Sequence, residues 1–325
     1  MTHYLFLIIG AILLTGCAKG SSPATSSAAP KEVQTVPVFS ADSAYNAVER
    51  QLEFGPRVPG SEAQEACALW LHQELERYGA KVVEQRATVT AYDGTRYPCI
   101  NLVGSYNPEA KHRILLMAHW DSRPIADEDP DPAKRNEPIP AANDGASGVG
   151  VLLEIARQAS LQSPRAGIDI FLTDAEDLGA PSSWEGPHNE EAWGLGTQQW
   201  CQNPHVSGYT ATYGILLDMV GSPNASFYRE YYSDYYANDV VSLVWKTAAK
   251  LGYKHLFVDK TGAGITDDHV FVNRSLGIPT IDIIDTRVGG NGSFFPYWHT
   301  TDDTLDKISK ETLQKVGDVI MHLIY

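Results

Sequence analysis

Acidic and imidazole side chains follow several apolar runs of this sequence, at the point where each run ends. His119 and Asp121 follow RILLMA, Glu176 and Asp177 follow IDIFLTDA, and Asp218 follows YGILL. Short, continuous apolar runs of this kind predict strands that are buried on both faces of a parallel sheet. Because ligands of open α/β sheets bind at the carboxyl ends of the strands, we expect these side chains to converge on one edge.

Two residues outside these runs could join them in a metal site. Asp144 stands in AAND before a predicted helix, and His299 stands in PYWHTTDDT near the C-terminus. Zn²⁺ accepts imidazole and carboxylate ligands, and catalytic zinc sites keep one coordination position open. Asp144, Asp177 and His299 would make such a site. Glu176, next to a ligand, would then be free to act as the general acid and base.

Each of these side chains also has a purely structural explanation. Asp144 could cap its helix, and His119 could be a satisfied core histidine. Glu176 and Asp177 could be a solvated pair in a loop. The sequence TTDDT, residues 300–304, is expected to cap the final helix. So many of these residues stand at strand ends of one domain that a catalytic or metal-binding role is favoured over a structural one.

The elements that must position these residues alternate along the chain. We expect strands over 81–92, 100–106, 113–119, 167–174, 213–219 and 279–285. We expect helices over 40–54, 61–79, 145–160, 234–252 and 306–324. Strands that alternate with helices predict a twisted, mostly parallel central sheet with helices on both faces. We therefore expect one α/β domain over residues 41–325.

The N-terminus is expected to be an export signal. The apolar run YLFLIIGAILLTGC is too short for an ordinary transmembrane helix and suits a signal peptide. It ends in LTGC, which resembles the bacterial lipobox, although no Lys or Arg precedes the run. An ordinary secretory signal is the alternative. We expect a lipoprotein signal peptide over 1–17, lipidation of Cys17, a flexible tether over 18–40, and a periplasmic protein anchored to the membrane by its lipid.

The acidity of the chain argues against two classes of partner. Its 325 residues carry a formal net charge of −15, with a pI of about 5.0. Such a surface repels nucleic acid and anionic membranes, so we expect neither to bind the folded domain. Cys67, Cys99 and Cys201 form no CxxC motif or Cys/His cluster. We expect them to be buried as small apolar side chains.

Six short motifs carry a resemblance to a known family. AHWDS, NDGASGV, DAED, LLDMVG, DDH and WHTTDD follow one another in this order. Together they resemble the zinc peptidases of the leucyl-aminopeptidase type, family M28, and the resemblance covers nearly all of residues 41–325. More closely, they are similar to the glutaminyl-peptide cyclotransferases of the bacterial branch typified by Bacteroidetes lipoproteins. The resemblance implies a zinc-exopeptidase-like fold and a zinc-dependent enzyme.

The resemblance also implies an activity. Such an enzyme cyclises the N-terminal glutamine of peptides and exported proteins to pyroglutamate and releases ammonia. It would act as a monomer and hold one zinc per chain through Asp144, Asp177 and His299. Glu176 would shuttle the proton. Asp267, the first acid of DDH, would hold and stabilise the reacting groups.

Three further residues take substrate-binding roles by this resemblance. Trp298 and Phe294 would form the aromatic wall around the glutamine side chain, and Asp218 would join the hydrogen-bond network beside it. Two positions depart from the animal cyclotransferases. Those enzymes carry glutamate at the position of Asp177 and histidine at the position of Asp282.

Two other functions stay open. A di-zinc aminopeptidase of the same fold would need five ligands, and the sequence offers His119, Asp144, Asp177, Asp218 and His299. Against it, family aminopeptidases usually carry a small residue where Asp267 stands and tyrosine where Trp298 stands. The third function, a binding lipoprotein without catalysis, conflicts with the intact acid/base and ligand positions.

The lipobox generates a testable prediction. The change Cys17→Ser removes the thiol that lipidation requires, so we expect the variant to lose its lipid and to keep the activity of its folded domain. Metabolic labelling with palmitate measures this, with Ser21→Ala in the tether as the control. Wild-type labelling of Cys17→Ser would contradict the assignment.

Overall fold

The computed structural model of this protein describes residues 35–287 and 294–325. The predicted signal peptide, Cys17 and the predicted tether as far as residue 34 lie outside the described residues. The last part of the predicted tether is packed: Phe39 is buried, and a Cβ added to Gly317 would lie 2.4 Å from its ring. No described helix is long and apolar enough to cross a membrane.

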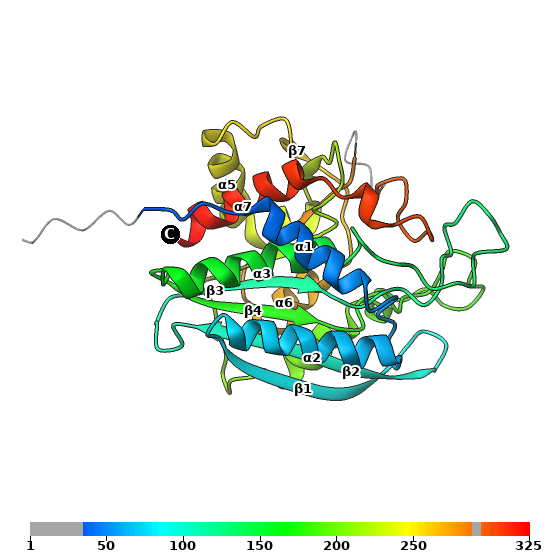
Figure 1. The fold of residues 1–325 in the computed structure, drawn as a ribbon. Coiled ribbons are helices and arrows are strands. Elements are labelled where there is room, and N and C mark those ends of the chain that lie inside the picture. The colour runs from blue at the N-terminus through cyan, green and yellow to red at the C-terminus, as the bar shows by residue number, and fades with distance from the viewer. Residues whose placement is uncertain (1–34, 288–293) are drawn as a thin grey trace, which may run out of the picture. The chain divides into compact units, whose positions relative to one another are not determined.

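A six-stranded sheet organises the fold, with its strands in the order β1-β2-β4-β3-β5-β8. Figure 1 shows β1, β2, β4 and β3 side by side in this order. The strands are β1 (Lys81–Thr90), β2 (Arg96–Tyr106), β3 (Arg113–His119), β4 (Gly167–Thr173), β5 (Tyr213–Asp218) and β8 (Thr280–Ile284). β3 pairs in parallel with β4 and β5, and β5 pairs in parallel with β8. Within this sheet β2 alone points in the direction opposite to the other five strands. The predicted mostly parallel sheet is confirmed.

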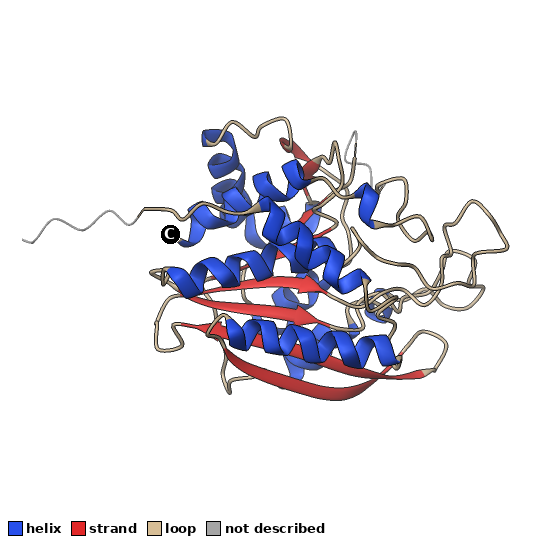
Figure 2. Cartoon of the chain, viewed as in Figure 1, coloured by secondary structure: helices blue, strands red, loops and turns tan. Residues whose placement is uncertain are grey.

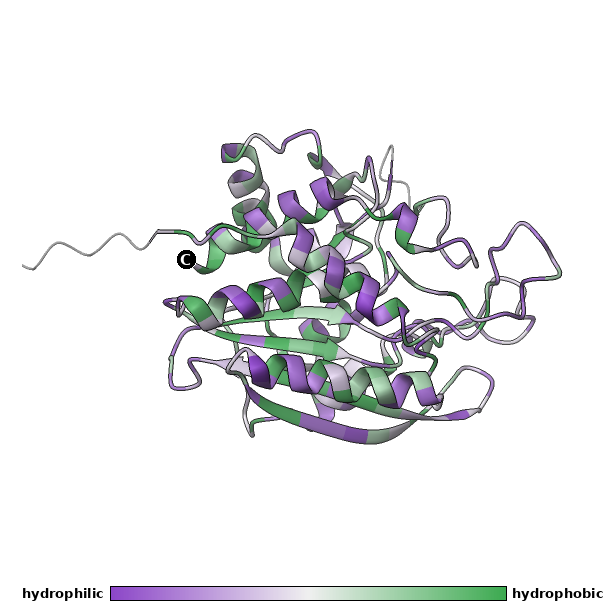
Figure 3. Ribbon diagram, viewed as in Figure 1, coloured by the Kyte–Doolittle hydropathy of each residue, from purple (hydrophilic) through white to green (hydrophobic). Residues whose placement is uncertain are grey.

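Helices cover both faces of the sheet, as predicted (Figure 2). One face carries α1 (Ala41–Leu52), α2 (Glu62–Arg77), α3 (Ala146–Leu161), α5 (Tyr231–Lys250) and α7 (Lys310–Ile324). The other carries α4 (Leu195–Gln202) and α6 (Asp268–Leu276). Figure 3 shows the corresponding pattern of hydropathy, in which the central strands are mostly hydrophobic and α1 and α2 alternate between hydrophobic and hydrophilic residues.

Strand β3 lies at the centre of both cores. Leu116 and Ala118 enter the core under α1, α2 and α3, whereas Leu115 and Met117 enter the core under α4 and α6. This alternation follows from the two-residue period of a strand. Burial of each leucine or methionine side chain contributes roughly 1.5–3 kcal/mol. The strand that leads into His119 is therefore firmly anchored.

Some short elements were not predicted from the sequence. These are α4, α6, the strands β6 (Phe227–Arg229) and β7 (Phe257–Thr261), and the 3-10 turns η1 (Glu190–Ala192) and η2 (Leu305–Lys307). Each has at most nine residues, too few for a clear periodic pattern. Helix α5 begins at Tyr231, three residues earlier than expected, and is kinked at Ala237 (φ −143°, ψ 43°).

The prediction that residues 300–304 cap the final helix is wrong. Helix α7 begins at Lys310, and its cap is Ser309, whose hydroxyl accepts a hydrogen bond from the Thr312 amide at 3.2 Å. Thr304 precedes η2 without a side-chain capping bond. The cysteine prediction is confirmed, because Cys67, Cys99 and Cys201 are buried and unpaired.

The contact between α3 and β5 generates a prediction. A Cβ added to Gly148 would lie 2.1 Å from the Leu217 carbonyl oxygen. Alanine normally stabilises a helix by about 1 kcal/mol over glycine, but here the clash reverses the sign. We expect Gly148→Ala to lower the free energy of unfolding by about 1–3 kcal/mol. Denaturant titration measures this change. Ser160→Ala, at the exposed end of the same helix, is the control, and a stabilised Gly148→Ala would contradict this packing.

Candidate active site

The predicted convergence at one edge of the sheet is confirmed. β4, β3 and β5 are adjacent and parallel, so their carboxyl ends meet. His119 is the last residue of β3, Asp218 is the last residue of β5, and Glu176 with Asp177 follows β4. Asp144 reaches the same edge from the loop before α3. All of these side chains are buried.

Asp144, Asp177 and His299, the predicted metal ligands, lie together in a buried group that could hold a metal ion. The Nε2 atom of His299 lies 3.2 Å from Asp177 Oδ1 and 3.7 Å from Asp144 Oδ2. The second oxygen of Asp177 and the Oδ2 atom of Asp144 have no hydrogen-bond partner among the described residues. Buried carboxylate oxygens without partners are costly unless a cation binds them. Together with one imidazole nitrogen, they fit the ligand preference of Zn²⁺.

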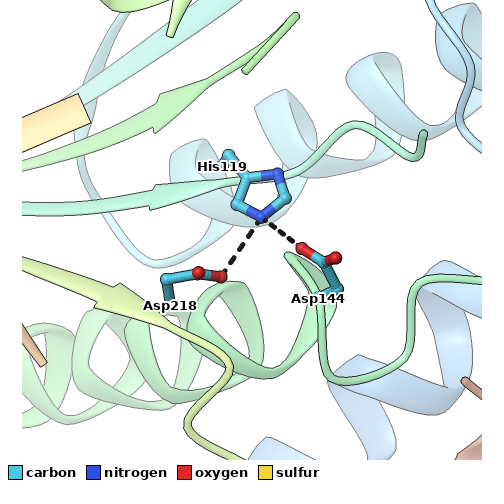
Figure 4. A group of neighbouring side chains, drawn as sticks. All are labelled: His119, Asp144 and Asp218. Carbon is cyan, nitrogen blue, oxygen red and sulfur yellow. Dashed lines mark ion pairs between the residues drawn. The ribbon is translucent and has the colours of Figure 1, made fainter. Parts of the chain in front are cut away.

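A second group of possible ligands shares Asp144 (Figure 4). The side chain of His119 points between two carboxylates, with Nε2 at 3.1 Å from Asp144 Oδ1 and 3.3 Å from Asp218 Oδ1. Its other nitrogen, Nδ1, lies 3.4 Å from Asp121 Oδ1. The structure therefore brings together all five side chains that a di-zinc site would need.

Arg123 and Asp127 hold the first group in place from behind. Asp127 Oδ1 lies 3.2 Å from His299 Nδ1, opposite the nitrogen that faces the aspartates. Arg123 donates to both oxygens of Asp127, at 2.7 and 3.0 Å, and to Asp177 Oδ1 at 3.1 Å. A carboxylate on the far nitrogen orients a ligating imidazole and raises its basicity. Both residues belong to a loop without periodic pattern, so the sequence did not indicate them.

Two more buried carboxylates fix the backbone of the site. Asp121 accepts hydrogen bonds from the amides of Glu176 and Asp177, at 3.1 and 3.2 Å. Asp303 accepts from the amides of Asn143 and Asp144, at 2.9 and 3.0 Å. The role expected for Asp303 as a helix cap is therefore replaced by a role in the site. Asp121 and Asp303 therefore position the loops that carry the candidate ligands.

The crowding of carboxylates shifts their pKa values. Burial, together with the nearby Asp267 carboxylate, raises the pKa of Glu176 well above its ordinary value. Burial raises the pKa of Asp218 to about 7. For His299, burial lowers the pKa, but the Asp177 and Asp127 carboxylates together outweigh burial and raise the pKa to about 9. The site therefore carries an excess of negative charge that a divalent cation would offset.

Backbone strain is concentrated around these residues. Four non-glycine residues in the left-handed region flank or belong to the site: Ala141 (φ 57°), Ala175 (φ 55°), Met219 (φ 48°) and His299 (φ 55°). Each such residue costs roughly 1–2 kcal/mol. The sequence shows no sign of this strain, because glycine is absent from all four positions.

A pocket of about 180 Å³ opens beside the first group. The predicted residues Glu176, Asp218, Asp267, Phe294 and Trp298 all line it. The Trp298 ring stacks on His299 with centroids 3.7 Å apart, and Phe294 lies 4.6 Å from Trp298. The aromatic wall expected next to the metal group is therefore present.

The sequence missed part of this pocket. Trp193, Met219, Ile265, Thr266 and Ile284 also line it. Trp193 faces His299 at 6.3 Å, and a Cβ added to Gly179 would lie 2.0 Å from the Trp193 ring. This contact has no signature in the sequence, so the sequence did not indicate Trp193. The apolar residues have no chemical signature of their own.

A third buried group includes Asp267, which also lines the pocket. Asp267 caps α6 and accepts a hydrogen bond from the Asp268 amide at 2.5 Å. Asp282 of β8 and His269 lie near it, with ligating atoms of the three within 4.8 Å. Burial and the Asp267 carboxylate raise the pKa of Asp282 well above its ordinary value. The His269 Nε2 atom contacts Glu230 at 3.1 Å.

This sheet and this edge of buried ligands define a metal-dependent α/β enzyme of the zinc-exopeptidase type. The sequence matches peptidase family M28 over residues 101–324, and the chain belongs to that family.

Known relatives with this fold carry different names. The crystal structure of Bacteroides thetaiotaomicron glutaminyl cyclase bound to N-acetylhistamine is 52% identical, with a TM-score of 0.88 over 90% of this chain and 99% of that chain. A Zn-dependent exopeptidase from Parabacteroides distasonis is 49% identical, with a TM-score of 0.87 over 90% of this chain and 99% of that chain. An aminopeptidase of Bacillus subtilis is 27% identical over 257 residues, which cover 74% of this chain and 48% of that entire protein. The chain thus spans about half the length of this aminopeptidase.

The contact between Asp127 and His299 generates a prediction. The change Asp127→Asn removes the negative charge that orients the imidazole, and we expect zinc affinity to fall by about 10- to 100-fold with the fold retained. Competition with a chromophoric chelator measures the affinity, and circular dichroism checks the fold. Glu128→Gln, at the exposed neighbouring residue, is the control. Unchanged affinity in Asp127→Asn would remove the orienting role.

Proposed function

We propose that this protein is a zinc-dependent glutaminyl-peptide cyclotransferase, which converts the N-terminal glutamine of peptides and proteins to pyroglutamate and releases ammonia. The observation that carries the proposal is the pocket, in which two carboxylates with no assigned ligand role, Glu176 and Asp267, face an aromatic wall beside the metal group. The similarity to a bacterial glutaminyl cyclase over 99% of its length supports it.

One zinc ion is proposed, held by Asp144, Asp177 and His299. When bound there, zinc supplies a Lewis acid that polarises the γ-carbonyl of the substrate glutamine. His119 and Asp218 then stay outside the zinc site, with His119 Nε2 between Asp144 Oδ1 at 3.1 Å and Asp218 Oδ1 at 3.3 Å. Closure of the five-membered ring needs no water, because nucleophile and electrophile belong to one residue.

Glu176 is proposed to move the proton. The substrate α-amine has an ordinary pKa of about 7.7–8, so much of it is protonated at neutral pH. The raised pKa of Glu176 brings its carboxyl closer to that range, which suits general acid–base catalysis. As the α-nitrogen forms its bond to the γ-carbon, Glu176 takes a proton from it. When the bond to the amide nitrogen breaks, Glu176 returns that proton and ammonia leaves.

The remaining pocket residues position the substrate. Asp267, fixed by its capping bond to the Asp268 amide, accepts a hydrogen bond from the leaving amide nitrogen. Trp298 and Phe294 hold the glutamine side chain in the folded-back conformation that ring closure requires. The pocket volume of about 180 Å³ is below the ~300–1,000 Å³ typical of sites for drug-sized ligands, and suits one residue.

We also propose that the enzyme acts in the periplasm as a lipid-anchored monomer on exported proteins and peptides. The support is the LTGC motif at residues 14–17. This placement would bring the enzyme to chains whose N-terminal glutamine is exposed after export.

A di-zinc aminopeptidase is the second candidate. The observation that favours it is the second group of possible ligands, in which His119 and Asp218 share Asp144 with the first group. The Bacillus subtilis relative is named an aminopeptidase. The presence of Asp267 in the pocket favours the cyclotransferase instead, because hydrolysis by two metals has no evident use for a further carboxylate there.

Incubation with two peptides distinguishes these functions. We expect ammonia release and a mass loss of one ammonia from a glutamine-leading peptide, and no free leucine from a leucine-leading peptide. Metal analysis of the active protein should give one zinc per chain, and removal of zinc by a chelator should abolish turnover. Release of leucine, with two zinc ions both required, would favour the aminopeptidase.

The division of roles between neighbours at the end of β4 generates a further prediction. Glu176→Gln should keep zinc and lose the proton shuttle, so we expect kcat for ammonia release to fall by about 10²- to 10⁴-fold with KM changed much less. Asp177→Ala, the matched variant, should lose both zinc and activity. Metal analysis and kinetics on the same preparations show whether each variant keeps its zinc and its turnover. Loss of zinc from Glu176→Gln would show that the two roles are exchanged.

A further inference from the structure

A cluster of tyrosines beside the pocket has no part in the proposed chemistry. Helix α5 opens with Tyr231, Tyr232, Tyr235 and Tyr236, which we call the tyrosine ridge. Tyr231 and Tyr235 are 51% and 70% exposed, and their rings stack with centroids 6.5 Å apart. Tyr232 and Tyr236 meet them edge to face, at 5.6 and 4.9 Å. Exposed aromatic rings that gather in this way are typical of binding surfaces rather than of core packing.

The backbone holds the tyrosine ridge as a separate, fixed turn. The kink at Ala237 divides it from the rest of α5. Glu230, which is buried, caps this turn and accepts hydrogen bonds from the amides of Tyr232 and Ser233, at 2.8 and 2.5 Å. A surface that is already ordered loses little entropy when a partner binds.

One end of the tyrosine ridge is joined to the wall of the pocket. The same Glu230 carboxylate accepts a hydrogen bond from the amide of Ile265 at 2.9 Å, and Ile265 lines the pocket. The Tyr231 amide donates to the Ala263 carbonyl at 3.1 Å, two residues before Ile265. The ridge and this wall of the pocket are therefore positioned by one carboxylate.

The other end approaches a second wall of the pocket. The hydroxyl of Tyr236 accepts a hydrogen bond from Arg274 at 3.2 Å, and the Arg274 guanidinium lies 3.4 Å from Glu190. Glu190 begins the turn η1, which is followed directly by Trp193. The tyrosine ridge is thus linked at one end to Ile265 and at the other to the turn that precedes Trp193, and both of these residues line the pocket.

The pocket leaves room for little more than the terminal residue of a peptide. Its volume of about 180 Å³ suits one side chain with its backbone. The rest of a peptide must therefore leave the pocket across its rim. We propose that the tyrosine ridge binds the residues that follow the N-terminal glutamine, and that it favours aromatic over acidic side chains there. This inference rests on the proposed cyclotransferase function.

The chemistry of the ridge supports that preference. Aromatic side chains stack on tyrosine faces or meet them edge to face. A carboxylate side chain has no ring that could stack in this way, so the ridge stabilises an aromatic residue of the peptide more than an acidic one.

Two matched double variants test the proposal. Tyr231→Ser with Tyr235→Ser removes both exposed rings, whereas Tyr231→Phe with Tyr235→Phe keeps them. The substrates are the dipeptide amide Gln-Ala and pentapeptides that begin with glutamine and carry one phenylalanine or one glutamate at position three, four or five, among alanines. Ammonia release gives kcat and KM for each.

We expect the wild type and the phenylalanine pair to prefer at least one phenylalanine peptide over its glutamate counterpart. The serine pair should lose about five- to tenfold in kcat/KM for that peptide, through KM, and should cyclise the dipeptide amide like the wild type. The proposal is overturned by an unchanged preference in the serine pair, by no preference in the wild type, or by an equal loss on the dipeptide amide. Absence of turnover of every glutamine substrate by the wild type would instead refute the cyclotransferase, and the ridge proposal with it.

Discussion

The burial of several carboxylates against two imidazoles is the constraint on which the rest of the site depends. Removing an ionised group from water costs several kcal/mol even after relaxation, and a group of like charges costs more. The protein offsets this cost with two buried guanidinium groups, those of Arg123 and Arg57, and with backbone amides that donate to Asp121 and Asp303. Among the buried carboxylate oxygens without a hydrogen-bond partner, one each of Asp144 and Asp177 belongs to the group with His299, where a dication would offset their charge.

The same carboxylates hold together parts of the chain that are far apart in sequence. Asp303 bonds to the amide of Asn143, a separation of 160 residues, and Asp121 bonds to the amide of Asp177, a separation of 56 residues. Loops at a sheet edge have few apolar contacts of their own, so such polar ties determine their conformation. A change at one of these acids is therefore expected to move a candidate ligand on another segment.

Periodicity and strand ends allowed much of this protein to be predicted. Every strand of the central sheet was expected, and most of them carry a short apolar run, whereas β1 does not. The positions of His119, Glu176, Asp177 and Asp218 at one edge followed from those strands. Trp298, Phe294 and Asp267 were reached through the family resemblance, and the structure brings them to the same pocket.

Some residues of the site could not be predicted from the sequence, for physical reasons. Arg123 and Asp127 lie in a loop, where the neighbours of a side chain depend on tertiary contacts. Ile265 and Ile284 line the pocket, but an apolar pocket residue looks like a core residue in the sequence. Asp303 was assigned to a helix cap because that role is local, and its true partners, the amides of residues 143 and 144, are not.

The left-handed residues around the site carry a consequence for engineering. Ala141, Ala175, Met219 and His299 hold a conformation that glycine would adopt with less strain. Substitutions that relax these positions should raise thermal tolerance, yet they would also free the loops that aim the ligands. Stabilising substitutions are therefore better placed on the outer surfaces of α1 and α2, away from the site, where they can raise stability without lowering turnover.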